Sequence, residues 1–302
     1  MKPIRPFLLK LSTLSLLTFL AFVLIQASST NLPSFTDSNS AILSKHTFPL
    51  KMDFASEIVP IDDPDVYERL DREMVVNINY HSNTTLVIKR ANKLFPIIEP
   101  ILKKNNIPDD FKYLAVIESS LTNAVSPAGA KGVWQFLSST AKEKGLEIRK
   151  EVDQRYHLKK ATQAACDYLL EAKEKFGNWT LAAAAYNAGI NGIEKQLDTQ
   201  KVTNYYHLLL NQETSRYVFR ILALKEIMKN PKIYHFDIPK NQLYQREKTK
   251  EITINKSISN LAEFALSKNI NYKTLKRHNP WLRKNSLTIN PGKSYQITLP
   301  IK

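Results

Sequence analysis

Residues 113–136 read YLAVIESSLTNAVSPAGAKGVWQF and contain one carboxylate, Glu118, among apolar, small and neutral polar residues and one lysine. On a helix that enters this segment, Phe111, Leu114 and Ala115 precede Glu118 by seven, four and three residues, so they lie on or beside its face. A carboxyl group in an apolar stripe is costly to ionise, which predicts a raised pKa and a role as general acid. The commoner use of a glutamate, an ion pair with arginine or lysine, is the alternative.

The residues after Glu118 are typical of a ligand-binding wall. Gly129 and Gly132 are surrounded by small residues, as is needed where a backbone passes close to a ligand. Trp134 and Gln135 follow, and an aromatic ring and an amide suit the apolar face and the hydroxyl and acetamido groups of a sugar. For Trp134, packing in the core is an equally weighted alternative.

Three motifs occur in order: ESS with SPAGAKGVWQF, then AAAAYNAG at 182–189, and QETSRYVFRILA at 212–223. Together they resemble the motifs of family 1 lytic transglycosylases with the soluble lytic transglycosylase (SLT) domain, and their spacing is similar to the membrane-bound lytic murein transglycosylase D subgroup. The resemblance covers about residues 90–236. It implies a mainly α fold with a lysozyme-like helical catalytic domain. It also implies cleavage of the β-1,4 bond between N-acetylmuramic acid and N-acetylglucosamine in peptidoglycan, with 1,6-anhydromuramyl products.

The first motif carries three expected site residues. By resemblance, Glu118 is the catalytic acid and base, Ser126 contacts the N-acetyl group or helps to position the acid, and Gln135 contacts the substrate. The stretch between Glu118 and Ser126 is slightly shorter than the family pattern, which leaves the role of the serine open.

The other two motifs carry four expected substrate-binding residues. By resemblance, Tyr186 and Asn187 form the pair whose tyrosine reaches the reacting sugar or the acid. Glu213 braces the cleft and Tyr217 lines it, again by resemblance. Taken alone, Tyr186 and Asn187 are equally typical of an Ala-rich helix that ends at Gly189.

The number of acids bears on the mechanism. Ordinary glycosidases use two carboxylates, but after Glu118 the next acid is Glu143, and only Glu213 could come closer in space. A single carboxyl group would then make both proton transfers. In the family the internal nucleophile is the 6-hydroxyl of muramic acid, whereas water as acceptor, as in goose-type lysozymes, would give a hydrolytic muramidase. A non-catalytic peptidoglycan-binding or scaffolding protein is the third possibility.

The amino terminus predicts export. Residues 1–27 combine a basic head, an apolar run and small residues, which is typical of a secretory signal or of a retained membrane anchor. We therefore expect the periplasm or cell envelope, with membrane association possible through this segment. The polar tract that follows predicts a linker over 28–70.

Helical periodicity predicts a helical domain over 71–240, which the resemblance implies is the lysozyme-like catalytic domain. A helical pattern through residues 86–102 is interrupted by Pro96 and Pro100, which predicts breaks there. A new helix is expected to start near Asp109, where acids and a proline favour a helix entrance. Further helices are expected at about 159–176, 179–188 and 213–229.

The last segment, 243–302, reads strand, helix, helix, strand, with strand-like EITI at 251–254 and YQITLP at 295–300. It resembles a LysM glycan-binding module, which implies a small βααβ domain. The framework positions that match are Ile252, Ile258, Leu261, Ala262, Leu275, Asn279, Pro291, Gly292 and Pro300. Asn255, Lys256 and Ser257 replace the usual Gly-Asp-Thr, so the module is expected to dock or to target the wall, with glycan binding left open.

Composition limits the remaining classes of function. The 302 residues are 43% hydrophobic and 24% charged with a net charge of +15, which predicts a globular protein attracted to polyanions. Export and the lack of a basic helix interleaved with aromatics argue against nucleic acid. The one cysteine, Cys166, is expected to be a buried thiol, and the scattered histidines predict no metal site. We expect no cofactor, and a monomer that binds peptidoglycan glycan strands.

Overall fold

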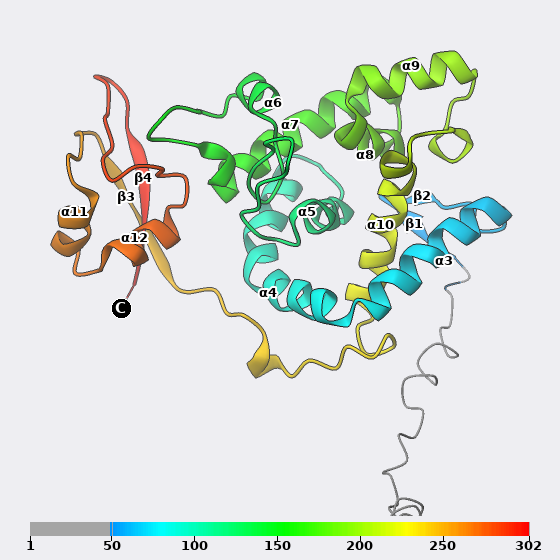
Figure 1. The fold of residues 1–302 in the computed structure, drawn as a ribbon, viewed down its shortest axis with the longest axis horizontal. Helices are drawn as coiled ribbons and strands as arrows, with labels where there is room; N and C mark the ends of the chain where they lie inside the picture. The colour runs from blue at the N-terminus through cyan, green and yellow to red at the C-terminus, as the bar shows by residue number, and fades with distance from the viewer. Residues whose placement is uncertain (1–48, 50, 302) are drawn as a thin grey trace, which may run out of the picture. The chain divides into compact units, whose positions relative to one another are not determined.

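The computed structural model describes residues 49 and 51–301. The predicted signal or anchor over 1–27, and the linker prediction up to residue 48, lie outside the described residues. Helices make up most of the described chain, and a small β-α-α-β unit lies at its carboxyl end (Figure 1). The predicted fold class is therefore confirmed. Among the described residues, no helix combines the length and hydropathy that crossing a bilayer requires.

Secondary structure is present at positions where the sequence predicts a linker. Strands β1 (Asp53–Phe54) and β2 (Glu57–Ile58) form a short hairpin, and helix α3 (Pro64–Asn79) follows. Phe54 is fully buried. Its ring packs edge to face on the ring of Phe111, with 5.2 Å between the two ring centroids. The segment from 51 to 70 was expected to be linker, but it is folded because Phe54 supplies part of the core of the helical domain.

Helix α4 (His81–Lys104) runs through both internal prolines, so the predicted breaks at Pro96 and Pro100 do not occur. Each proline removes one hydrogen bond from the helix, which is a local cost. Ile98 and Leu102 are buried on the same helix, and their burial stabilises the helical conformation across that gap.

Helix α5 (Lys112–Ser119) carries Glu118 and lies inside the helical domain, where it packs on α4 and α10 (Figure 1). It is preceded by the 3-10 turn Asp109–Phe111, so the helix entrance predicted near Asp109 is confirmed. Phe111, Leu114 and Ala115 are fully buried, as their spacing from Glu118 predicts.

The remaining helices of the domain follow α5 in the chain. They are α6 (Ser138–Glu143), α7 (Leu158–Phe176), α8 (Trp179–Ala188), α9 (Ile190–Gln200) and α10 (Gln212–Lys229). Three of them, α7, α8 and α10, coincide with the predicted helices to within a residue. Further 3-10 turns lie at Gln154–Tyr156, Tyr205–His207 and Lys240–Gln242. Cys166 is buried on α7, as expected.

The C-terminal unit, residues 249–301, is a two-stranded antiparallel sheet with two short helices. Strand β3 (Thr249–Ile254) pairs with β4 (Tyr295–Pro300), and α11 (Leu261–Ser267) and α12 (Tyr272–His278) lie between them in sequence. Asn279 is fully buried, where its amide nitrogen donates to Thr298 O at 2.7 Å and its oxygen accepts from Thr298 N at 2.8 Å. These bonds join the end of α12 to β4.

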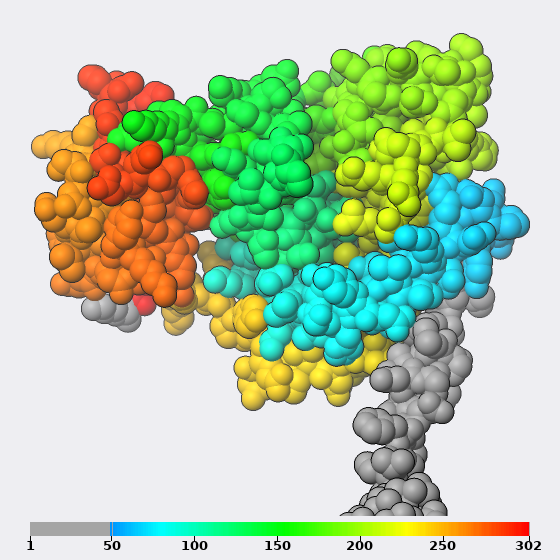
Figure 2. Space-filling model, viewed as in Figure 1, coloured from blue at the N-terminus to red at the C-terminus, as the bar shows by residue number. Residues whose placement is uncertain are grey.

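The C-terminal unit packs against the segment that joins α6 to α7. Figure 2 shows its surface (orange and red) meeting the green surface of the helical domain. Val152 and Tyr156, from the segment that joins α6 to α7, are buried in the same hydrophobic cluster as Leu282 and Trp281. Asp153 N donates to Trp281 O at 2.9 Å, as a strand would. The two parts are therefore joined by apolar contact and by backbone pairing.

Candidate active site

Glu118 lies in the last turn of α5 and its side chain is half-buried. The helix ends there because Ser120 and Leu121 both have positive φ, of 50° and 57°. Burial raises the pKa of Glu118 to about 7, and the negative charge of Glu213 acts in the same direction. The partial negative charge at a helix carboxyl end also disfavours an ionised acid. The raised pKa predicted from the apolar stripe has its main cause in burial.

Two groups from α10 oppose that rise. The Tyr217 hydroxyl donates a hydrogen bond to Glu118 Oε1, and the Arg220 cation lies close enough to lower the pKa of the carboxyl group. Burial raises the pKa of Tyr217 well above its usual value, so this tyrosine stays protonated and remains a donor. Because Oε1 accepts that bond, Oε2 is the oxygen that can carry the exchangeable proton.

Glu118 opens into a cleft with a volume of about 470 Å³. Every site residue expected from the sequence lines this cleft: Glu118, Ser126, Gln135, Tyr186, Asn187, Glu213 and Tyr217. They come from α5, from the segment that connects α5 to α6, from α8 and from α10. The fold thus brings together three motifs that are far apart in sequence.

Gln135 is held in an uncommon backbone conformation, with φ of +50°. Its amide nitrogen donates to Gly132 O at 2.6 Å and to Ala124 O at 3.1 Å, so both amide hydrogens are used inside the protein. Its Oε1 atom has no hydrogen-bond partner among the described residues. Gln135 can therefore offer an acceptor to a donor in the cleft, such as the N–H of an acetamido group.

Ser126 shapes the turn on the opposite side of that loop. Its backbone N–H donates to Ala130 O at 2.9 Å, and its Oγ accepts from Ala130 N at 3.0 Å. The hydroxyl hydrogen is then left for an acceptor in the cleft. This arrangement fits a serine that contacts a substrate carbonyl better than one that holds the acid, because none of its hydrogen bonds reaches Glu118.

The second and third motifs support each other across the cleft. Asn187 donates from Nδ2 to Glu213 Oε1 at 2.9 Å and accepts at Oδ1 from the Thr214 hydroxyl at 2.8 Å. Tyr186 donates to Trp134 O at 2.8 Å. Tyr186 therefore contacts the loop of the first motif, and the exposed carboxylate of Glu213 is fixed by an amide.

In the loop after Glu118 the structure selects core packing for Trp134, and the ligand-facing interpretation of Gly132 is wrong. Trp134 is fully buried and its Nε1 donates to Thr162 Oγ1 at 2.8 Å. The ring therefore belongs to the core and is not exposed to a sugar in the cleft. Gly132 allows a close approach, but to protein: a Cβ atom there would lie 2.0 Å from Arg155 O. The loop packs inward at both positions, and Gly129 has open space.

Two arginines were missed by the sequence analysis. Arg220 donates to Ile117 O at 2.9 Å and places its charge beside Glu118, and its spacing of three residues from Tyr217 on a helix could have indicated this. Arg155 is buried in a bidentate ion pair with Asp153 and also donates to Gly129 O and Phe136 O, both at 3.2 Å. It holds both ends of the cleft loop, and nothing in the local sequence indicates it.

Metal or thiol chemistry finds no support near this cleft in the described part of the chain. No group of three or more histidine, cysteine, aspartate or glutamate residues in residues 49 and 51–301 could hold a metal ion. Burial raises the pKa of Cys166 to about 12, so its nucleophilic thiolate form is scarce at neutral pH.

Comparison with known families matches both parts of the chain. Residues 95–209 match the transglycosylase SLT domain, and residues 250–302 match the soluble lytic transglycosylase C-terminal LysM-like domain. The chain is 35% identical over 169 residues to the membrane-bound lytic murein transglycosylase D of Escherichia coli K12, and equally to the protein of that name from Escherichia coli O6:H1. The match covers 54% of this chain but only 37% of each relative.

The SLT match lies within the helical domain and ends before α10, and the LysM-like match covers the C-terminal unit. The SLT match contains Glu118 and the cleft loop, and the second match contains both strands of the C-terminal unit. The chain therefore contains a transglycosylase SLT domain followed by a lytic transglycosylase C-terminal LysM-like domain.

Proposed function

We propose that this protein is a murein lytic transglycosylase that cleaves the β-1,4 bond between N-acetylmuramic acid and N-acetylglucosamine and releases 1,6-anhydromuramyl products. The observation that carries the proposal is the state of Glu118. Its carboxyl group opens into the cleft, has a pKa of about 7, and accepts a hydrogen bond from Tyr217 on one oxygen. At neutral pH such a group is protonated and ionised in comparable amounts, so it can both give and take a proton.

The proposed reaction uses Glu118 twice. Protonated Oε2 first donates its proton to the glycosidic oxygen, the bond to the anomeric carbon breaks, and the leaving sugar departs with that proton. The acetamido group of the substrate stabilises the positive charge that develops at the anomeric carbon. Ionised Glu118 then takes the proton of the 6-hydroxyl of the muramic acid, whose oxygen bonds to the anomeric carbon. This closes the 1,6-anhydro ring and restores the protonated acid.

The other cleft residues have binding roles in this proposal. Gln135 Oε1 accepts from the acetamido N–H, and the Ser126 hydroxyl donates to a carbonyl or hydroxyl of the strand. Tyr217 keeps the carboxyl group of Glu118 in one orientation. Asn187 holds Glu213 at the edge of the cleft, where the glutamate can accept from sugar hydroxyls.

The proposed setting is the cell envelope. The relatives are named membrane-bound lytic murein transglycosylases, and the sequence predicts a signal or anchor over 1–27. We propose that the chain binds peptidoglycan glycan strands through the cleft, with the LysM-like domain beside it. A net charge of +15 favours attraction to an acidic wall polymer.

Hydrolysis is the second candidate, and Glu213 is the observation that favours it. This glutamate lines the same cleft and its charge raises the pKa of Glu118. A second carboxylate could activate water as the base of an inverting hydrolase. We prefer the lytic reaction because Glu213 is already bound to Asn187 and is exposed to solvent.

Products from isolated murein sacculi test the proposal. The purified chain should release 1,6-anhydromuropeptides, which mass spectrometry separates from reducing-end products by the mass of one water. Glu118→Gln should lose activity by at least a hundredfold, whereas Glu143→Gln, an exposed glutamate outside the cleft, should keep it. Glu213→Gln should still form anhydro products. Reducing-end products that depend on Glu213 would establish the hydrolase, and no release by the wild type would leave a binding protein.

A further inference from the structure

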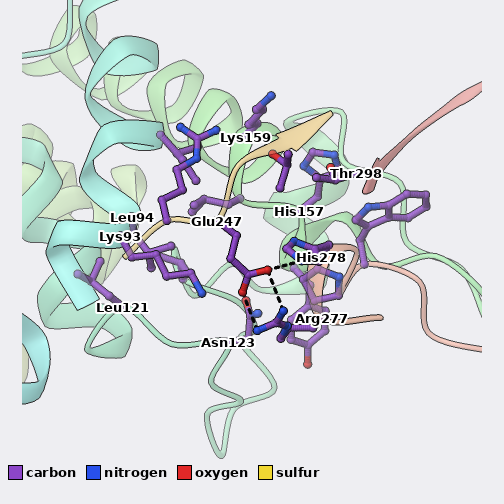
Figure 3. A pocket seen from close by; sticks show the side chains of 18 of the residues that line it. Lys93, Leu94, Leu121, Asn123, His157, Lys159, Glu247, Arg277, His278 and Thr298 are labelled. Carbon is purple, nitrogen blue, oxygen red and sulfur yellow. Dashed lines mark hydrogen bonds and ion pairs between the residues drawn. The ribbon is translucent and has the colours of Figure 1, made fainter. Parts of the chain in front are cut away.

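A second pocket, with a volume of about 480 Å³, lies between the helical domain and the C-terminal unit (Figure 3). Its volume is in the range of specific ligand sites. The apolar part of its lining includes Leu94 and Ile97 of α4, Leu121, and Trp281 of the C-terminal unit. This surface suits aliphatic groups such as the methyl groups and alkyl chains of a peptide.

The same pocket carries an excess of positive charge. Five cations line it, from α4, α7, α12 and the segment that leads into β3: Arg90, Lys93, Lys159, Arg246 and Arg277. Its only lining carboxylates are Glu247 and Glu251, so five cations against two anions leave a net charge of +3. An excess of this sign inside a concave site attracts anions.

The two carboxylates are already used by neighbouring cations. Glu247 pairs with Arg277 at 2.8 Å and accepts from His278 at 3.1 Å, as Figure 3 shows, and Glu251 pairs with Lys159. Burial lowers the pKa of His278, so this histidine adds little charge at neutral pH. The excess therefore resides on the other lining cations.

Two of those cations have no compensating group. Among the described residues, Lys93 and Arg246 have no hydrogen-bond or ion-pair partner, whereas Arg90 donates to Ser120 O at 3.1 Å. Lys93 is half-buried and belongs to the rigid helix α4, which is a fixed position for a cation. Two unpaired cations beside the apolar part of the lining favour a ligand that has both carboxylates and aliphatic groups.

The pocket and the cleft share one loop. Leu121, Asn123 and Val133 line the pocket, while Ser126 and Ala130, between them in sequence, line the cleft. A ligand that enters both sites therefore needs to cross a single loop. A peptide of four residues spans about 13 Å when extended.

We propose that this pocket binds an acidic peptide, the carboxylate-bearing stem that peptidoglycan carries on its muramic acid residues. The proposal rests on the proposed function, because it assigns the stem of the same strand whose glycan lies in the cleft. Lys93 and Arg246 bind the carboxylates of the stem, and the apolar part of the lining contacts the aliphatic side chains of the stem. The protein consequently prefers peptide-bearing strands to naked ones.

The test compares two substrates for the full chain. One is peptide-bearing glycan strands, and the other is the same strands after an N-acetylmuramoyl-L-alanine amidase has removed the stems. The double variant Lys93→Glu/Arg246→Glu should lose about tenfold in kcat/KM on peptide-bearing strands and stay within twofold on naked strands. Lys93→Gln/Arg246→Gln should show a smaller loss in the same direction, which guards against a folding defect in the double charge reversal.

A matched control separates local from overall charge. Lys103→Glu/Lys273→Glu changes the net charge by the same amount at exposed positions outside the pocket, and it should affect both substrates equally. If the pocket variant behaves like this control, or changes neither substrate, the stem site is wrong while the proposed function stands.

Binding of the free tetrapeptide stem provides a readout that needs no catalysis. Isothermal titration calorimetry should detect the peptide with wild type and with Glu118→Gln, and should not detect it with Lys93→Glu/Arg246→Glu. If wild type cleaves neither substrate, the proposed function fails. This titration alone then tests whether the pocket binds the stem peptide. Absence of peptide binding to the wild type, or equal binding to the charge-reversal variant, would contradict the proposal.

Discussion

The chemistry of Glu118 depends on a balance between burial and two neighbours on α10. Burial is the largest influence and raises the pKa of the carboxyl group, whereas the Tyr217 hydroxyl and the Arg220 cation lower it. The result, a pKa of about 7, lies where one carboxyl group can serve both as acid and as base. A glutamate at its ordinary pKa would be ionised at neutral pH and would be a poor proton donor.

The pH dependence of cleavage follows from this pKa. The first proton transfer needs protonated Glu118, and that form is lost as the pH rises through about 7. The rate should therefore fall towards tenfold per pH unit above pH 7 to 8. Initial rates of anhydromuropeptide release between pH 5 and 9 measure this limb.

Tyr217→Phe tests whether the alkaline limb belongs to Glu118. The substitution keeps the ring and removes the hydrogen bond that lowers the pKa of Glu118. The alkaline limb should then move to higher pH. A limb that stays in place in Tyr217→Phe, or one near pH 4.5 in the wild type, would assign the titration to another group.

The same carboxyl group should also affect stability. The folded pKa of Glu118, about 7, exceeds the ordinary value of 4.5, so the folded state binds the proton more tightly. The associated stability is complete below pH 4.5 and is lost as the pH rises through 7. Relative to wild type, Glu118→Gln should gain about 2 to 3 kcal/mol in free energy of unfolding between pH 4 and pH 8.

Urea unfolding at the two pH values measures this difference, with Glu143→Gln as the exposed control. Parallel pH dependence in Glu118→Gln and wild type would mean that the carboxyl group is not buried in solution.

At the scale of elements, the loop between α5 and α6 depends on a contact made later in the chain. Arg155 binds the carbonyl groups of Gly129 and Phe136, and its own carbonyl lies against Gly132. Asp153 satisfies the charge of this buried arginine with two hydrogen bonds. The cleft loop thus takes its shape from the segment that precedes α7 as well as from its own sequence.

Two glycine substitutions separate backbone conformation from close packing. Gly129 and Gly132 have nearly the same φ, +81° and +84°, but only Gly132 lies against Arg155 O. Gly129→Ala should cost about 1 kcal/mol in free energy of unfolding, for the left-handed conformation alone. Gly132→Ala should cost about 3 kcal/mol or more, because a Cβ there meets backbone that cannot move aside.

Thermal and urea unfolding of both variants measure the two costs. Equal costs would show that the contact with Arg155 O relaxes easily.

The parts of the fold that the sequence predicts are those set by local periodicity. The apolar stripe before Glu118 follows from helical spacing, α10 has a clear entrance at Asn211, and α7 has a clear end at Gly177. The role of Arg155 could not be predicted, because its partners are carbonyl groups 26 and 19 residues away, which no side-chain pattern encodes. The sequence left Trp134 undecided between the core and the ligand-binding wall, because core and cleft positions alternate along one short loop.

The early hairpin was missed at this scale as well. Residues 53–58 include only one aromatic, and the decisive contact joins Phe54 to Phe111, far along the chain. Met52 and Val59 are buried as well, but so short a hairpin does not stand out from a linker until its partner in the fold is placed.

At the scale of the molecule, the segment that joins α6 to α7 connects the helical domain to the C-terminal unit. Val152 lies in the shared core, and Glu151 binds the loop before β4 through the Ser286 hydroxyl at 2.8 Å and Thr288 N at 3.0 Å. Because the second pocket lies between the two parts, a change in this connection alters the proposed stem site without touching Glu118.

Acid should weaken that connection through Glu151. The hydrogen bonds from Thr288, Ser286 and Arg149 outweigh its burial and lower the pKa of Glu151 to about 2. For a lowered pKa, the stabilisation is present above the ordinary value of 4.5 and is lost as the pH falls towards 2. We expect the joined arrangement to lose about 1 to 2 kcal/mol between pH 5 and pH 2, a figure reduced for solvent screening.

Limited proteolysis with pepsin across pH 2 to 5, followed by mass spectrometry, should show cleavage between residues 237 and 248 increasing as the pH falls. Glu151→Gln keeps the shape and removes the titrating group, so it should be cleaved faster than wild type at pH 5 and at a similar rate at pH 2. If wild type and Glu151→Gln differ equally at every pH, Glu151 contributes hydrogen bonds but no charge to the connection. The connection would then rest on the apolar contacts of Val152 and Tyr156 with the C-terminal unit.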